Sequence, residues 1–78
     1  MDAGALRQLI RQRIQDGRLP RDDTLELAHG HGIGQVCDGC GAEIARDQSM
    51  TVRIDRTNYR TIRLHDECFR IWDAERLL

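Results

Sequence analysis

Cys37-Asp38-Gly39-Cys40 and His65-Asp66-Glu67-Cys68 are the two stretches of sequence that decide how this chain folds. Each stretch carries two metal-binding side chains with two residues between them. Together they supply three thiolates and one imidazole, which is a complete ligand set for a tetrahedral structural zinc ion. The sequence therefore predicts one Zn²⁺ per chain. Its predicted ligands are Cys37, Cys40, His65 and Cys68.

The length of the chain makes a stabilising metal plausible. With 78 residues the chain forms one small domain, and a domain of this size buries too little apolar surface to be stable by its core alone. The aromatic residues are few, namely Tyr59, Phe69 and Trp72. A structural zinc contributes about 10–16 kcal/mol at neutral pH, and in small domains this becomes folding free energy.

Cysteine usage points to a reducing compartment. All three cysteines lie in the two motifs, and an odd number argues against a closed set of disulfides. The N-terminus enters a charged pattern directly, so no signal peptide is expected. No apolar run is long enough to span a bilayer. We expect a cytoplasmic protein.

Charge is balanced overall and uneven along the chain. The net charge of −1 would become −2 with zinc on three thiolates. Residues 1–21 carry five Arg and two Asp, residues 22–48 carry six acids and one Arg, and residues 49–78 are near balance. This distribution does not indicate a general nucleic-acid binder.

Residues 1–18 are predicted to form an N-terminal segment with an amphipathic helix over residues 3–16. Asp2 can cap its start, and Pro20 prevents its continuation. The apolar positions at helical spacing are Leu6, Leu9, Ile10 and Ile14. We expect this stripe to pack on the zinc module, and the alternative is a face for a partner or a second copy.

Residues 19–36 are predicted to be a connector. Asp22-Asp23-Thr24 can cap a helical turn over Leu25, Leu27 and Ala28. The glycine-rich run 29–34 follows no apolar strand, which argues against a phosphate loop and favours a flexible approach to Cys37. Two histidines in this run, His29 and His31, offer too few ligands for a second metal, so we interpret them as solvated loop residues.

Residues 35–78 are predicted to be the zinc-binding module, which starts with a knuckle at residues 37–41. Residues 49–55 and 59–65 alternate between apolar and polar side chains and are joined by a short turn, which predicts an antiparallel hairpin. The first strand is expected to point Met50, Val52 and Ile54 inward and Thr51, Arg53 and Asp55 outward, and the second to point Ile62 and Leu64 inward and Thr61 and Arg63 outward.

A second helix is predicted to follow the hairpin. Asp66 can cap it, and it is expected to run to about Leu77. This places Cys68 in the first turn, where the helix dipole favours a thiolate. Its expected buried face consists of Phe69, Trp72 and Leu77. The whole chain is thus predicted to be a small, zinc-stabilised α+β domain.

The order of knuckle, hairpin and ligand-bearing helix over residues 35–78 resembles the treble-clef zinc finger. The whole chain also resembles a group of short, uncharacterised bacterial zinc proteins. The features that carry this second resemblance are Leu6-Arg7, Ile10-Arg11, Gly17, Leu19-Pro20, the alternate glycines at 30, 32 and 34, Cys37-Asp38-Gly39-Cys40-Gly41, His65, Cys68 and Trp72. The resemblance implies zinc binding at Cys37, Cys40, His65 and Cys68, and it implies no activity.

These observations favour a non-catalytic zinc module that binds a protein partner through its N-terminal helix, as a monomer or a homodimer. The alternative is nucleic-acid binding by an outward hairpin face. That face would carry Arg53, Arg56, Tyr59, Arg60 and Arg63. An enzyme is not expected, because four protein ligands leave no open position on zinc and Glu67 lacks the context of a deaminase motif. A redox switch at Cys37 and Cys40 is disfavoured, because the chain needs its metal to fold.

Overall fold

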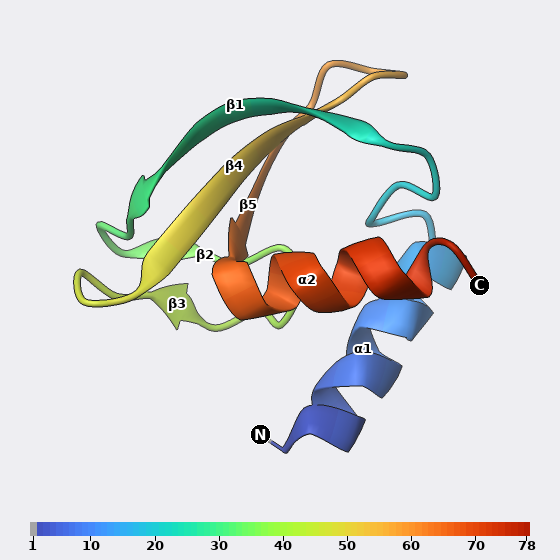
Figure 1. Ribbon diagram of the computed structural model, residues 1–78, viewed down its shortest axis with the longest axis horizontal. Coiled ribbons are helices and arrows are strands. Elements are labelled where there is room, and N and C mark those ends of the chain that lie inside the picture. Colours follow the sequence, from blue (N-terminus) through green and yellow to red (C-terminus); the bar gives the residue numbers. More distant parts are fainter. Residues whose placement is uncertain (1) are drawn as a thin grey trace.

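The computed structural model describes residues 2–78 and has the predicted small α+β architecture (Figure 1). A three-stranded sheet with strand order β1-β4-β5 lies against the C-terminal helix, and a separate two-stranded ribbon, β2-β3, carries the knuckle. The elements in chain order are α1 (Ala3–Gln15), β1 (Thr24–His31), β2 (Gln35–Val36), β3 (Glu43–Ile44), β4 (Ser49–Asp55), β5 (Thr61–His65) and α2 (Asp66–Glu75).

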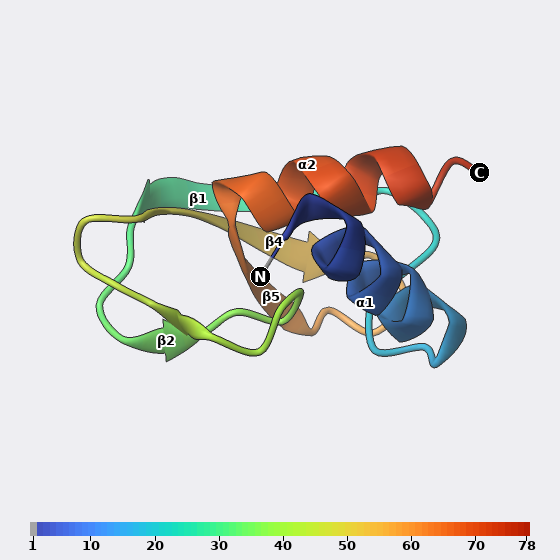
Figure 2. The same ribbon diagram turned by 90° about the horizontal axis from the view of Figure 1, so that it is seen from below.

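Helix α1 begins and packs as the sequence predicts. The Asp2 side chain caps it by accepting a 2.8 Å hydrogen bond from the amide of Ala5. Leu6, Ile10 and Ile14 are buried in the core, and α1 lies beneath α2 (Figure 2). Three residues of the predicted stripe are therefore used inside the chain, and the fourth, Leu9, is half-buried.

The predicted helical turn in the connector is wrong, because this segment forms strand β1. The strand pairs antiparallel with β4, from Thr24 opposite Asp55 to His31 opposite Ser49, with a register shift between Glu26 and Ala28. Thr24 is its one buried residue, so no alternation of burial marks the strand. The unpaired edge of β4 offers backbone partners to this segment, and that tertiary pairing outweighs local capping signals.

The predicted β4–β5 hairpin is confirmed, but its two apolar sets lie on opposite faces. Residues directly opposite each other in an antiparallel pair share a face. Arg53 is opposite Ile62 and Thr51 is opposite Leu64, so Ile62 and Leu64 share a face with the polar side chains of β4.

Helix α2 packs on this mixed face of the sheet. Thr51 Oγ1 donates a 2.9 Å hydrogen bond to Asp66, and the Arg53 guanidinium lies 4.9 Å from the centre of the Phe69 ring. Thr51 and Asp55 are buried, and the side chain of Arg53 is 14% exposed. The prediction that Thr51, Arg53 and Asp55 point outward is therefore wrong.

Helix α2 differs from its prediction at both ends. His65, rather than Asp66, occupies the N-cap position, and Asp66 binds neighbouring side chains instead. The helix ends at Glu75, and Leu77 is 71% exposed, so Leu77 is not part of the buried face. Trp72 is buried as predicted, and its indole N–H donates a 2.8 Å hydrogen bond to the carbonyl of Pro20.

A buried carboxylate fastens α1 to α2. The side chain of Glu75 is 5% exposed, and its two oxygens lie 3.4 Å from Arg7 Nε and 3.0 Å from Arg11 Nη2. A buried charge is tolerated only when it is paired. These two arginines pair with it across the helix interface, although their side chains are more than half exposed. Neither helix of residues 2–78 is long and apolar enough to cross a membrane.

Candidate metal centre

Three separate parts of the fold bring the four predicted ligands together. Cys37 and Cys40 lie in the turn between β2 and β3, His65 ends β5, and Cys68 lies in the first turn of α2. Their ligand atoms all lie within 4.8 Å of one another, and they form a group that can hold a metal ion. Cys37 and Cys68 are buried, whereas Cys40 and His65 are half-buried.

Backbone amides of the knuckle point at the sulfur atoms. Gly39 N and His65 N donate to Cys37 Sγ at 3.3 and 3.4 Å, and Ala42 N donates to Cys40 Sγ at 3.4 Å. Hydrogen bonds from N–H groups stabilise a negatively charged sulfur. The turn is therefore built to hold thiolates, the form in which cysteine binds metals.

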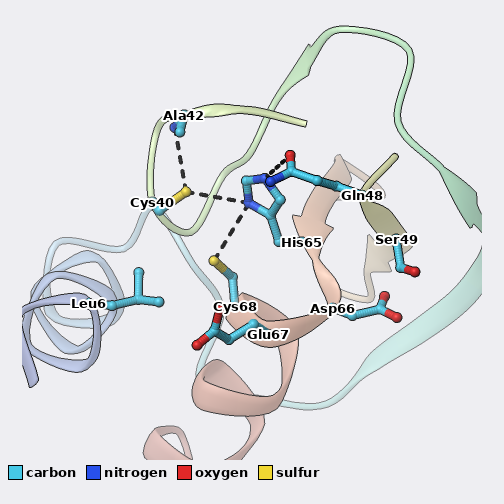
Figure 3. A pocket seen from close by; sticks show the side chains of 9 residues that line it. All are labelled: Leu6, Cys40, Ala42, Gln48, Ser49, His65, Asp66, Glu67 and Cys68. Carbon is cyan, nitrogen blue, oxygen red and sulfur yellow. Dashed lines mark hydrogen bonds between the residues drawn. The ribbon is translucent and has the colours of Figure 1, made fainter. Parts of the chain in front are cut away.

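The imidazole of His65 is oriented by bonds on its far side (Figure 3). Its Nε2 atom lies 3.0 Å from Gln48 Oε1 and 3.2 Å from the carbonyl oxygen of Glu43, both of which accept hydrogen bonds. Nε2 is thus the protonated nitrogen, and the lone pair of Nδ1 faces Cys40 Sγ at 3.4 Å and Cys68 Sγ at 3.8 Å. Such outer bonds fix the tautomer of a metal-binding histidine. The spacing of the two motifs did not indicate that Gln48 would bond to His65.

The three thiols cannot all ionise by themselves. The hydrogen bond with Cys68, helped by backbone amides, lowers the pKa of Cys37 to about 4 against the opposing effect of burial. The same hydrogen bond, burial and the nearby thiolates raise the pKa of Cys68, and burial is the main cause that raises the pKa of Cys40. The cluster accepts one negative charge readily, and a divalent cation would supply the charge needed to hold all three thiolates.

A close approach between two loops explains one glycine of the glycine-rich run. A Cβ atom on Gly32 would meet the backbone carbonyl oxygen of Ile44, which has no room to move. The amide of Gly32 bonds to Gln48, and the amide of Gly34 bonds to Ile44. The run thus packs against the strand that leaves the knuckle, and Gly32 makes this packing sterically allowed.

The two histidines before the knuckle do not join the cluster. The prediction that they lie in a loop is wrong, because both are residues of β1. His29 Nε2 lies 3.1 Å from both carboxylate oxygens of Asp66, and its side chain is 55% exposed. Among the described residues, the four predicted ligands are the one group of three or more His, Cys, Asp or Glu side chains that could hold a metal ion.

A shallow cavity of about 440 Å³ opens beside the cluster. Its lining includes Leu6 of α1 and three of the predicted ligands, Cys40, His65 and Cys68 (Figure 3). Its polar lining consists of Gln48, Ser49, Asp66 and Glu67. Helix α1 therefore forms part of the surroundings of the metal centre.

No protein-family model, no curated protein and no solved structure matches this chain. The resemblance to treble-clef zinc fingers and to short bacterial zinc proteins therefore stays a prediction. The four-residue cluster is supported by its geometry alone.

Proposed function

We propose that this chain is a non-catalytic zinc-binding module whose metal is structural. The observation that carries this proposal is the convergence of three cysteine sulfurs and one oriented imidazole nitrogen within 4.8 Å. Three thiolates and one imidazole suit Zn²⁺, whereas Mg²⁺ and Ca²⁺ prefer oxygen ligands.

The spacing of the ligand atoms supports zinc. With Zn–S bonds of about 2.3 Å and a Zn–N bond of about 2.0 Å, a tetrahedral site places nitrogen and sulfur about 3.5 Å apart. In this chain His65 Nδ1 lies 3.4 Å from Cys40 Sγ and 3.8 Å from Cys68 Sγ. These two distances are close to those of a tetrahedral zinc site.

The composition of the ligand set favours a structural rather than a catalytic role. Catalytic zinc sites keep one position for water or substrate, whereas four protein ligands fill the tetrahedron. Two of the four ligands are buried, as expected of a site that organises a core. We therefore propose that the chain is not an enzyme.

Native mass spectrometry tests the metal assignment. We expect one zinc per chain in the wild-type protein and none retained in Cys40→Ser under the same conditions. His31→Ala is the matched control and should keep one zinc, because His31 lies outside the cluster. Two zinc ions per chain, or a folded protein that takes up none, would overturn the proposal.

We further propose that the module recognises a protein partner through the outward face of α1. Its inward face is packed on α2, while Gln8, Gln12 and Gln15 remain exposed beside Arg7 and Arg11. Capture from lysate with and without nuclease separates protein from nucleic-acid partners. A partner that resists nuclease and is lost with Gln8→Glu/Gln12→Glu would support this surface; equal capture by both proteins would refute it.

Nucleic-acid binding is the second candidate, and one exposed aromatic residue favours it. Tyr59 at the hairpin end is 75% exposed, and Arg56 and Arg60 beside it are also exposed. Arg53, however, is occupied by Thr24 and Asp23, so it does not contribute to this surface. Salt-dependent binding of labelled single strands that is lost with Tyr59→Ala would support this candidate, because phosphate contacts release counterions and bases stack on aromatic rings.

A further inference from the structure

Arg13 reaches from the last turn of α1 to the metal knuckle. Its Nη1 atom donates a 2.9 Å hydrogen bond to the carbonyl oxygen of Asp38, a residue between the two cysteines of the turn. On its other side Asp38 is held by β5, because Asp38 N donates to the Arg63 carbonyl and Arg63 N donates to Asp38 Oδ2. The turn is thus fixed between a helix and a strand.

The far end of the knuckle is shaped around the same guanidinium group. A Cβ atom on Gly41 would lie 3.1 Å from Arg13 Nη2, and Gly41 has φ +82°, where side chains are rarely tolerated. Only glycine combines this backbone conformation with room for the guanidinium. Arg13 therefore packs on the turn at two points, next to Cys37 at one and next to Cys40 at the other.

One donor of the Arg13 guanidinium group is left without a partner. Its Nε atom is buried and has no hydrogen-bond partner among the described residues. Burying an unpaired donor on a charged group is unfavourable. A nearby negative charge would offset this cost, and three thiolates around a divalent cation carry a net charge of −1.

We propose that Arg13 is a positioning residue of the metal centre: it fixes the cysteine turn and balances the charge of the loaded site, so that docking of α1 and metal binding stabilise each other. This inference rests on the proposed zinc site. Coupling between two events is reciprocal, so the metal that strengthens the seat of Arg13 is itself held more tightly by it. Leu6 lines the same cavity as Cys40 and Cys68, so α1 borders the site at a second place.

The test compares Arg13→Gln with Arg18→Gln in the Co²⁺-loaded protein. Both variants remove one positive charge from residues 1–21, but the side chain of Arg18 is exposed, whereas that of Arg13 binds the knuckle. Without the cation beside the turn, the sulfur electrons rise in energy. We expect the sulfur-to-cobalt charge-transfer band to move to lower energy in Arg13→Gln alone, and Arg13→Lys to restore most of its position.

The rate of zinc transfer to a chelator gives a second readout. Loss of an outer residue of a metal site typically weakens metal binding about 10–100-fold, so we expect release at least about tenfold faster from Arg13→Gln than from Arg18→Gln. Equal rates together with an unmoved band would overturn the inference while leaving the zinc site intact. If the wild-type chain binds neither metal, the proposed function fails instead.

A measurement on the wild-type protein covers the case in which Arg13→Gln does not fold. In the zinc-loaded protein the Nε–H proton of Arg13 should exchange with water much more slowly than that of Arg18, whose side chain is exposed. Equal exchange would mean that the guanidinium is not seated on the knuckle, and the inference would be wrong.

Discussion

Replacing Trp72 by phenylalanine tests whether the core depends on an oriented indole. Trp72 is the one tryptophan of the chain and is 1% exposed. Its N–H bonds the carbonyl of Pro20 at 2.8 Å and so joins α2 to the segment after α1. Phenylalanine keeps an aromatic ring at this position but loses the hydrogen bond and part of the volume.

Two terms set the expected loss in the free energy of unfolding. The Pro20 carbonyl loses its partner. Because Pro20 is half-buried and partly reached by water, this loss costs about 1 kcal/mol, the low end of the range for an unpaired buried group. The smaller ring leaves a cavity of about 40 Å³, which at about 24 cal/mol per Å³ costs a further 1 kcal/mol or so. We expect a loss of about 2 kcal/mol, or a fall in Tm of about 8–16 °C in a domain of this size.

Urea unfolding of the zinc-loaded protein, followed by circular dichroism, measures this loss. Tyr59→Phe is the matched control, because it removes the polar tip of an aromatic ring that is 75% exposed and should change the unfolding free energy by less than about 0.5 kcal/mol. A Trp72→Phe variant as stable as wild type would refute the reasoning. Red-shifted, readily quenched native tryptophan emission would do the same.

Three further predictions concern the metal and the helix interface. Cys68→Ser, or a strong chelator, should abolish most tertiary structure, because the metal contributes free energy comparable with the whole stability of a small domain; dispersed amide spectra after chelation would contradict this. Acid should release the metal, because protons compete with it for the three thiolates and the imidazole; a zinc indicator should report release as the pH falls, and none as it rises from neutral. Glu75→Gln should lower the unfolding free energy by about 1–2 kcal/mol, because it weakens the ion pairs with Arg7 and Arg11, whose side chains are more than half exposed and stay solvated; faster amide exchange in α1, with the zinc content unchanged, is the expected signature.

The four-residue cluster was predictable because its members lie in two short motifs. A Cys-x-x-Cys turn brings two sulfur atoms close together, and a His-x-x-Cys motif brings an imidazole and a sulfur atom close together at a strand-to-helix junction. Helix α1 was predictable for the same reason, since Asp2 and the apolar positions act within a few turns. Each of these features depends on residues close in sequence.

Strand β1 was not predictable from local pattern. Leu25 and Leu27 are 46% and 57% exposed, so they carry no sign of a buried face. What makes this segment a strand is the edge of β4, whose paired residues lie between 18 (His31 with Ser49) and 31 (Thr24 with Asp55) positions later in the chain. Asp22 and Asp23 do not identify a helix start, because Asp also favours turns and loops.

The inward and outward faces of the hairpin were predicted wrongly, because alternation shows which residues share a face within one strand but not which face of the neighbouring strand lies beside them. The apolar set of β4 and the apolar set of β5 each alternate correctly, yet the register places Ile62 opposite Arg53 rather than Ile54. A shift of one residue in pairing exchanges the two faces of a strand. The register depends on the turn at residues 56–60, where Tyr59 has φ +60° and Asp55 accepts a hydrogen bond from Thr57 N.

This register gives α2 a surface of apolar and polar side chains to pack on, and this packing positions the helix turn that carries Cys68. Thr51 and Arg53 face α2 and hold it through Asp66 and the Phe69 ring, so the first turn of α2 is fixed independently of apolar packing. Cys68 lies in that turn, while α1 fixes the opposite side of the site through Arg13. Polar contacts from α1 and from the sheet to α2 thus flank the four-residue cluster on two sides and add to the order that the small apolar core provides.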